Sequence, residues 1–476
     1  MKALEVEKNR YFDSVFLMRI SATLERVEGV RQAVVAMGTP ANLALLVEAG
    51  FSVSQEILPG DLVIALEGET EEALERAQAE LQVLLTGTGL KAQDGEPVRR
   101  PSTLIDAAAA DPEANLALIS VPGAYAAREA RWALRKGLHV LLFSDNVSVE
   151  EEIALKDEAI RRGLLMMGPD CGTAILQGIP LGFVNVCRRG SVGLVGASGT
   201  GLQEISSLIH QWGGGISHAI GTGGRDLSRA VNGRMTLFAL DLLAHDPETE
   251  VLVVVSKTPE PAVADRVLRA LEAAKKPAIV QFVGERSAAR SGCVEISATL
   301  ADAARAAVCR AGNPLAARPG REEMEAASPS VVRGIEGNLL GLFCGGTLGQ
   351  EAAAILAGQG VELSCDLSQL HPDDKEPRFS DGHAIWDLGD DRFTRGKPHP
   401  MIEPRLRDAY VARAGEDRRV GLVLADCVIG FGAHENPAQS LAEAAQAAMG
   451  SARRDGRWLA VVASVTGTDD DPQGRS

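Results

Sequence analysis

Ten short runs of aliphatic and β-branched residues recur along the chain, with stretches of helical apolar spacing between them. Such a run has few polar positions, so a strand formed by it needs cover on both faces. Strands of this kind that alternate with helices are typical of parallel sheets. The pattern predicts an α/β fold built from several Rossmann-like or flavodoxin-like parallel sheets. The runs lie at 31–38, 61–68, 115–121, 139–144, 191–196, 250–256, 277–283, 338–344, 419–425 and 458–464.

Three stretches rich in Gly, Pro and charged residues divide the chain, and 311–337 is the most linker-like of them. Clear amphipathic helices are expected at 70–85 and 126–137, and Gly137, which follows two basic residues, marks a helix end. The resulting units are a small N-terminal α/β unit over 1–90, a second unit over 91–185, a third over 186–312, a linker over 313–334 and a fourth over 335–476.

Composition excludes several classes of function. The 476 residues carry a net charge of −16 without a Lys/Arg-rich run, which argues against nucleic acid as a partner. Seven dispersed cysteines with no CxxC pair indicate reduced thiols and a cytoplasmic location. We find no membrane span of roughly 20 apolar residues and no signal peptide. The histidines show no metal-ligand spacing, and HPDD (371–374) is interpreted as a solvated loop, so no metal site is predicted.

The segment VGLVGASGTGLQE (192–204) passes from a strand-like run through glycines and hydroxyl residues into a helix. A helix N-terminus offers unpaired N–H groups and partial positive charge, and glycines let an anion approach closely. The alternative is an ordinary strand-to-helix turn with a hydroxyl residue as N-cap. The glycine spacing matches neither a P-loop nor a dinucleotide fingerprint. Candidate phosphate or carboxylate ligands are Ser198, Gly199, Thr200 and Gly201.

Two glycine turns, GPDCGT (168–173) and AIGTGGRDLS (219–228), follow other strand-like segments. The aspartate of the first could orient a substrate or close a turn. Its cysteine could be a nucleophile, although such a residue is more often a small buried hydrophobic side chain. The arginine of the second could pair with an anion, or the turn could be an ordinary loop. Candidate substrate contacts are Asp170, Cys171, Gly223, Gly224 and Arg225.

The last unit holds a second candidate anion site. DCVIGFGAHENPAQSL (426–441) leaves a strand through glycines and reaches a helix that Asn436 caps, with Pro437 at its first position. In the preceding GKPHPMIEPRLR (396–407), three prolines make a rigid segment. Candidate residues in these two segments are His399, Arg405, Gly430, Gly432 and His434.

In combination, these motifs resemble the succinyl-CoA synthetase superfamily, and most closely its FdrA family. The resemblance rests on GPDCGTAILQGIPLGF, SVGLVGASGTGLQE, AIGTGGRD, GLFCGGTLGQEA, HPMIEPRLR and VASVTGTDDDPQ. It implies α-subunit-like units joined to a β-subunit-like unit in one chain. By this resemblance, 91–185 is a CoA-binding-like Rossmann domain, 186–312 is a flavodoxin-like ligase domain and 335–476 is a β-subunit-like domain. In members of the family, this last domain continues with another strand and helix after the strand that matches 458–464.

The chain departs from the synthetases in its chemistry. These enzymes carry phosphate on a histidine, whereas the matching stretch here, 284–304, has no histidine and places Cys293 near that position. The usual CoA-binding loop near the N-terminus is also absent, and no ATP-grasp domain is recognisable. Activation by ATP would therefore need another protein, and CoA is only a possible substrate.

The FdrA resemblance implies a subunit of a multi-subunit oxamate carbamoyltransferase, which moves a carbamoyl group between oxalurate and carbamoyl phosphate. Residues 198–201 would then hold phosphate and face Gly430 and Gly432 across a shared site. We expect Glu204 and His434 to be catalytic, and Arg225 or Arg405 to pair with the oxamate carboxylate. Partners would be other subunits of that complex, or further copies of the chain. The alternatives are an acid–CoA ligase subunit and a non-enzymatic metabolite-binding scaffold.

Overall fold

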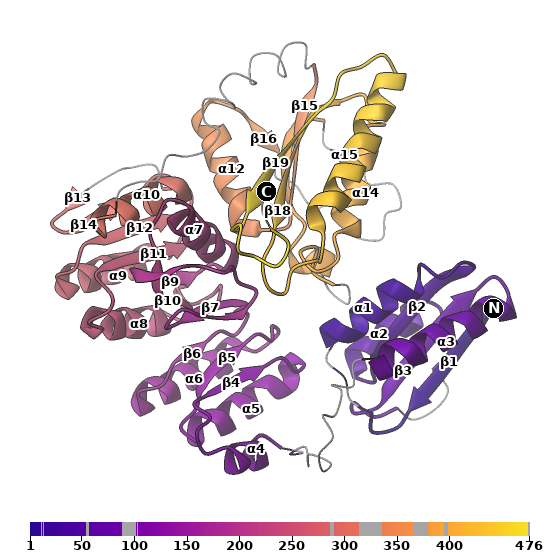
Figure 1. Cartoon of the computed structure of the whole chain (residues 1–476), viewed down its shortest axis with the longest axis horizontal. Coiled ribbons are helices and arrows are strands. Elements are labelled where there is room, and N and C mark those ends of the chain that lie inside the picture. Colours follow the sequence, from indigo (N-terminus) through magenta and orange to yellow (C-terminus); the bar gives the residue numbers. More distant parts are fainter. Residues whose placement is uncertain are drawn as a thin grey trace. The chain divides into compact units, whose positions relative to one another are not determined.

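The computed structural model describes residues 1–10, 12, 14–53, 57–87, 101, 103–285, 290–313, 336–364, 379, 381–394 and 398–474. The chain forms two compact units (Figure 1). The first contains 1–102 together with 393–399, and the second contains 103–392 together with 400–476. Most of the predicted linker 313–334, as well as HPDD (371–374), lies outside the described residues.

The N-terminal unit is a three-stranded sheet with helices. Strands β1 and β2 both pair antiparallel with β3, so the expectation of parallel strands is wrong for this unit. β3 is buried along almost its whole length because it is central and apolar clusters cover both of its faces. Its elements are β1 (Lys2–Glu7), α1 (Ser14–Leu24), β2 (Val30–Met37), α2 (Pro40–Glu48), β3 (Leu62–Gly68) and α3 (Glu71–Gly87).

The second unit begins with a small parallel sheet in the order β4-β5-β6. Its helix α5 ends as the sequence predicts, because Gly137 adopts φ 83° just beyond the last turn. Helix α6 begins at Ser148, whose side chain accepts from the Glu151 amide, and ends at the left-handed Gly163. The elements are α4 (Leu104–Ala110), β4 (Leu116–Ile119), α5 (Gly123–Arg135), β5 (His139–Leu142), α6 (Val149–Arg162) and β6 (Met166–Met167).

An eight-stranded sheet follows, in the order β13-β14-β12-β11-β9-β10-β7-β8. Its five middle strands are parallel, and an antiparallel pair closes each edge. The hairpin 173–182 belongs to this sheet, so the structural boundary precedes the predicted one at 185/186. The elements are β7 (Thr173–Leu176), β8 (Ile179–Gly182), β9 (Arg189–Ala197), α7 (Gly199–Gln211), β10 (Ile216–Gly221), α8 (Arg234–His245), β11 (Val251–Ser256), α9 (Pro261–Ala274), β12 (Ala278–Phe282), β13 (Arg290–Ser291), β14 (Val294–Ile296) and α10 (Leu300–Arg310).

The last sheet is wholly parallel, in the order β16-β17-β15-β18-β19. Asn436 caps α15 and Pro437 occupies its first turn, which confirms the predicted helix start. The elements are β15 (Asn338–Phe343), α12 (Gly346–Gly358), β16 (Leu363–Ser364), β17 (His383–Asp387), α13 (Asp391–Thr394), α14 (Arg405–Ala414), β18 (Val420–Val428), α15 (Pro437–Arg454) and β19 (Ala460–Thr466).

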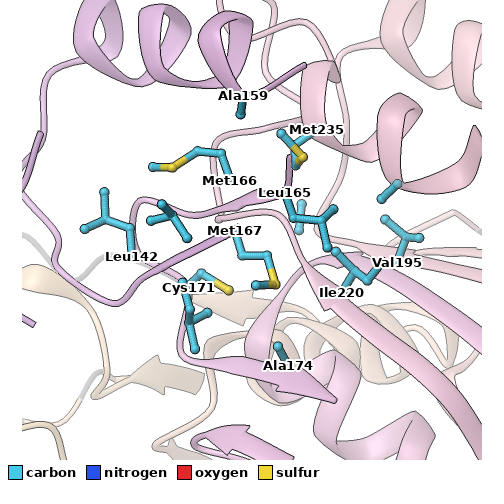
Figure 2. Close-up of a cluster of buried hydrophobic side chains, with 14 of the residues drawn as sticks. Leu142, Ala159, Leu165, Met166, Met167, Cys171, Ala174, Val195, Ile220 and Met235 are labelled. Carbon is cyan, nitrogen blue, oxygen red and sulfur yellow. The ribbon is translucent and has the colours of Figure 1, made fainter. Parts of the chain in front are cut away.

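Shared cores join the sheets of the second unit. One cluster of buried apolar side chains runs from the β4–β6 sheet into the eight-stranded sheet, and Figure 2 shows Met166, Met167 and Cys171 beside Ile220 and Met235. A second cluster joins the eight-stranded sheet to the last one. Because the carboxyl ends of parallel strands carry the loops that bind ligands in α/β folds, the strand ends near these junctions are where a site is expected. In the part of the chain that the structure describes, no helix meets the requirements for crossing a membrane.

Candidate functional site

The N-termini of α7 and α12 meet at the junction of two sheets. Ser198 caps α7 through the Gly201 amide, and its Oγ lies 2.6 Å from Oγ1 of Thr347 in the first turn of α12. The backbone of Gly345 also lies close to the Thr200 side chain, because a β-carbon on Gly345 would fall 2.9 Å from Cγ2 of Thr200. Two positive helix ends from different sheets therefore converge on one place.

Several amides at this junction keep their hydrogen-bonding capacity. Among the described residues, the backbone N–H groups of Gly199, Thr200, Gly346 and Thr347 donate to no protein acceptor. Such orphan donors at helix N-termini bind anions readily. Residues 198–201 are thus placed as the sequence predicts, although their role as phosphate ligands stays a prediction.

Asp426 satisfies the amides immediately before α12. Its carboxylate is fully buried and accepts from the Cys344 and Gly345 amides, each at 2.6 Å. Burial raises the pKa of Asp426, and the equally buried Arg407 donates to its backbone carbonyl at 3.0 Å. This internal carboxylate orients α12, and it leaves the next amides, those of Gly346 and Thr347, as the ones that point toward α7.

A lysine and a carboxylate flank the same helix end. Lys257 directly follows β11, and Asp387 is the last residue of β17. A β-carbon on Gly346 would collide with Oδ2 of Asp387 and lie 3.1 Å from Nζ of Lys257. Burial raises the pKa of Asp387 to about 6, against the opposing effects of Lys257 and of the Gly389 amide, which donates to Oδ1 at 2.9 Å.

Neither Lys257 nor Asp387 was among the candidates drawn from the sequence. A usable signal was present, because each stands at the carboxyl end of a buried apolar strand. The pairing of the helices had a signal too, since SGTGLQE (198–204) and GGTLGQE (345–351) share the same strand-turn-helix pattern.

Glu204 and Glu351 occupy equivalent positions on α7 and α12. Glu204 accepts a hydrogen bond from Thr466 Oγ1 at 2.5 Å. Glu351 accepts from the Leu300 amide at 2.6 Å, at the N-terminus of α10. Burial, with a contribution from the charge of Glu204, raises the pKa of Glu351 to about 7. The catalytic role of Glu204 stays a prediction, and its carboxylate lies along the α7–α12 contact.

The raised pKa of Glu351 predicts a pH-dependent stability. Because its folded pKa of about 7 exceeds its ordinary value of 4.5, the folded chain binds more protons between these values. The stability that Glu351 contributes to the folded chain is therefore complete below pH 4.5 and is lost as the pH rises through 7. We expect Glu351→Gln to flatten the urea-unfolding profile over this window, whereas the exposed Glu443→Gln should leave it unchanged. Parallel profiles for wild type and Glu351→Gln would contradict the assignment.

The substrate contacts predicted at 168–173 and 219–228 gather at one place, where Cys171 and Gly223 are buried while Asp170, Gly224 and Arg225 are exposed. A β-carbon on Gly223 would press on the backbone of Gly168, and one on Gly224 would lie 3.5 Å from the carboxylate of the exposed Asp170. Cys171 is buried in the core of Figure 2, and burial raises its pKa to about 12. The proposal that Cys171 contacts substrate is therefore wrong, because a buried neutral thiol neither binds nor attacks one.

Arg225 already has partners within the protein. Its guanidinium donates to the Val147 carbonyl at 2.8 Å and lies 2.9 Å from the buried carboxylate of Glu152. These contacts tie the glycine turn after β10 to α6, and the prediction that Arg225 pairs with a substrate anion stays a prediction.

The predicted corner at 430–436 does not supply the second helix end, which Gly345–Thr347 provides instead. The Gly430 amide donates to Gln473 Oε1 at 3.0 Å, and a β-carbon on Gly432 would fall on the Phe183 ring. Nδ1 of His434 accepts from the Asn436 amide at 3.1 Å. The Gly430 amide is therefore satisfied within the protein, whereas anion binding by Gly432 and the catalytic role of His434 stay predictions.

The two remaining substrate-binding candidates belong to different units. His399 belongs to the N-terminal unit and Arg405 to the second unit. Burial lowers the pKa of His399 to about 4, so its ring is neutral at pH 7. Arg405 pairs with Glu403 at 3.2 Å. Cys293, near the position expected for a phosphohistidine, is a half-buried free thiol.

Three family models match different parts of the chain. They are the AllF heavy metal-associated domain over 1–101, the CoA binding domain over 188–284 and the CoA-ligase domain over 342–476. The CoA-binding match falls on the eight-stranded sheet, and the assignment of 91–185 to a CoA-binding-like Rossmann domain stays a prediction. Residues 1–101 contain neither cysteine nor histidine, so this domain offers no thiolate or imidazole ligand to a metal ion. Across the described ranges, no cluster of three potential metal ligands occurs.

Similar proteins agree with this division. The α subunit of succinate–CoA ligase from Aquifex aeolicus is 29% identical over 150 residues, which cover 30% of this chain and 48% of that protein. The sulfoacetate–CoA ligase subunit SqwL from Acholeplasma is 28% identical over 33% of this chain and 54% of its own length. The chain thus spans about half the length of these two subunits. The uncharacterised protein YahF of Escherichia coli K12 is 42% identical over 98% of this chain and 91% of its own length. The chain therefore belongs to the same family as YahF, a succinyl-CoA synthetase-like fusion with an AllF-type N-terminal domain.

Proposed function

We propose that the chain is an acid–CoA ligase-type subunit that binds an acyl phosphate between α7 and α12 and transfers the acyl group to CoA. The observation that carries this proposal is the convergence of two helix N-termini from different sheets, with Ser198 and Thr347 2.6 Å apart. The free amides beside these hydroxyls suit a phosphate that gains negative charge as it leaves.

The ligase family supports CoA as the acceptor. The CoA-binding and CoA-ligase matches cover the two sheets that supply α7 and α12. An acyl phosphate is already activated, so this half-reaction needs neither ATP nor a covalent histidine. This half-reaction is therefore compatible with the absence of histidine from 284–304. A partner protein would make the acyl phosphate in the complete reaction.

Carbamoyl transfer is the second candidate, and the same absence of histidine favours it. Carbamoyl phosphate is a mixed anhydride like other acyl phosphates, so the same phosphate site would serve. The amide nitrogen of oxamate would replace the CoA thiol as acceptor. The two candidates therefore differ in the acceptor and share the site.

A transfer assay distinguishes these candidates. The full chain is incubated with acetyl or succinyl phosphate and CoA, or with carbamoyl phosphate and oxamate, and both phosphate release and product are measured. We expect Ser198→Ala to lower transfer at least about tenfold, since it removes the cap and a hydroxyl at the phosphate. Ser148→Ala, which removes a comparable cap from α6, should keep activity. Equal activity of the two variants would argue against the site.

A further inference from the structure

The acid–base groups of the α7–α12 site are not named by the synthetase resemblance, because the stretch that would carry the histidine has none. The transfer still needs a group that takes a proton from the acceptor and one that balances the charge of the departing phosphate. Two side chains at the junction have the right chemistry, and they come from different sheets.

Lys257 and Asp387 point at the same gap in front of α12. The hypothetical β-carbon of Gly346 would touch both side-chain ends, so a glycine is needed there to leave room between them. Both side chains are half-buried. In the part of the chain that is described, no hydrogen bond or ion pair engages the Lys257 ammonium, which leaves it available to an incoming anion.

We propose that Asp387 is the general base of this site and that Lys257 holds the phosphate whose departure Asp387 assists. This inference rests on the proposed function. The C–O bond between the acyl carbon and the phosphate oxygen breaks as the acceptor's sulfur or nitrogen forms its bond to that carbon. The proton of the acceptor passes to the Asp387 carboxylate and then to the leaving phosphate, so that atoms and charge balance without an oxidant or a metal ion.

The surroundings of Asp387 suit a base that works near neutral pH. The charged groups that face it are Lys257 from β11, Asp390 from the loop after β17 and Asp426 from β18. Burial and the two carboxylates favour its protonated form, while Lys257 and the Gly389 amide favour the charged form. The carboxylate is therefore a stronger base than an exposed aspartate, yet it is charged at pH 7.

Inorganic phosphate provides a test that does not depend on turnover. Calorimetric titrations at pH 6.5 in buffers of different ionisation enthalpy measure the protons taken up on binding. A phosphate dianion beside Asp387 raises its pKa, so wild type should take up more protons than Asp387→Asn. Asp241→Asn is the matched control, since Asp241 is exposed on α8 and is not among the charged groups that face Asp387. Lys257→Met should weaken phosphate binding on the order of tenfold.

Turnover gives the second measurement. Asp387→Asn should lower kcat/KM by roughly 10²–10⁴ and abolish the fall in activity below about pH 6, while Asp241→Asn keeps both the rate and the acid limb. Gly346→Ala fills the gap while both charged residues are kept, and it should lower phosphate affinity. Equal proton uptake by wild type and Asp387→Asn, or an unchanged acid limb, would overturn the role of Asp387 alone. Absence of phosphate binding by wild type would instead remove the proposed function, and the acid–base pair with it.

Discussion

Replacing Lys156 by alanine is expected to lower the free energy of unfolding by about 3–5 kcal/mol. Lys156 is fully buried, and its ammonium donates to Glu152 at 2.7 Å, to Asp226 at 2.8 Å and to the carbonyl of Thr222 at 2.8 Å. Its removal leaves the buried carboxylate of Asp226 without a cation and that of Glu152 with Arg225 alone, between the β4–β6 sheet and the eight-stranded sheet. Urea unfolding followed by circular dichroism measures the loss.

Arg161 provides the control on the same helix. Its side chain is 66% exposed and pairs with Glu158, so Arg161→Ala should cost at most about 1 kcal/mol. Removing all three buried charges together, with Lys156→Met, Glu152→Gln and Asp226→Asn, should recover part of the stability because no unpaired charge remains. Equal unfolding midpoints for Lys156→Ala and Arg161→Ala would show that this network does not join the two sheets.

Gly345→Ala is expected to lower phosphate affinity at least about tenfold and to destabilise the chain by roughly 1–3 kcal/mol. Its β-carbon would fall 2.9 Å from Thr200 and 3.1 Å from the buried carboxylate of Asp426. Since neither neighbour has room to move freely, the N-termini of α7 and α12 must separate. Calorimetric titration with inorganic phosphate measures the affinity.

Gly450→Ala is the matched substitution within a helix. A β-carbon there would lie in ordinary contact, 3.7 Å from the Arg454 guanidinium, so alanine should stabilise α15 by up to about 1 kcal/mol and leave phosphate binding unchanged. Phosphate binding by Gly345→Ala as tight as by Gly450→Ala would mean that the close approach of the two helices is not needed for the site.

The fold of the second unit follows closely from its apolar runs. Strands β9, β11 and β12 are buried along most or all of their length and lie where such runs predict them. Shorter strands such as β13 and β16 escaped detection, because two residues carry no periodic signal. The antiparallel pairing in the N-terminal unit was also missed. The apolar pattern of a buried central strand indicates that the strand is buried, and it does not indicate whether the neighbouring strands run parallel or antiparallel to it.

The candidate site was predicted on one side only. Ser198 and its helix were found because a glycine-rich strand end is visible in the sequence. The opposite side was assigned to Gly430–Asn436, since that segment has the better helix cap. A helix cap, however, indicates where a helix starts and not which groups lie opposite its N-terminus. The Gly430 amide donates to the side chain of Gln473, which lies 43 residues later in the sequence. Lys257 and Asp387 were missed because single charged residues gain meaning only when strands from two sheets bring them together.

A crystal structure of the wild-type chain with bound phosphate tests the central claim most directly. We predict phosphate between α7 and α12, within hydrogen-bonding distance of the amides of Thr200 and Thr347 and of the ammonium of Lys257. Phosphate bound at another place while this junction remains filled by protein side chains would contradict the account.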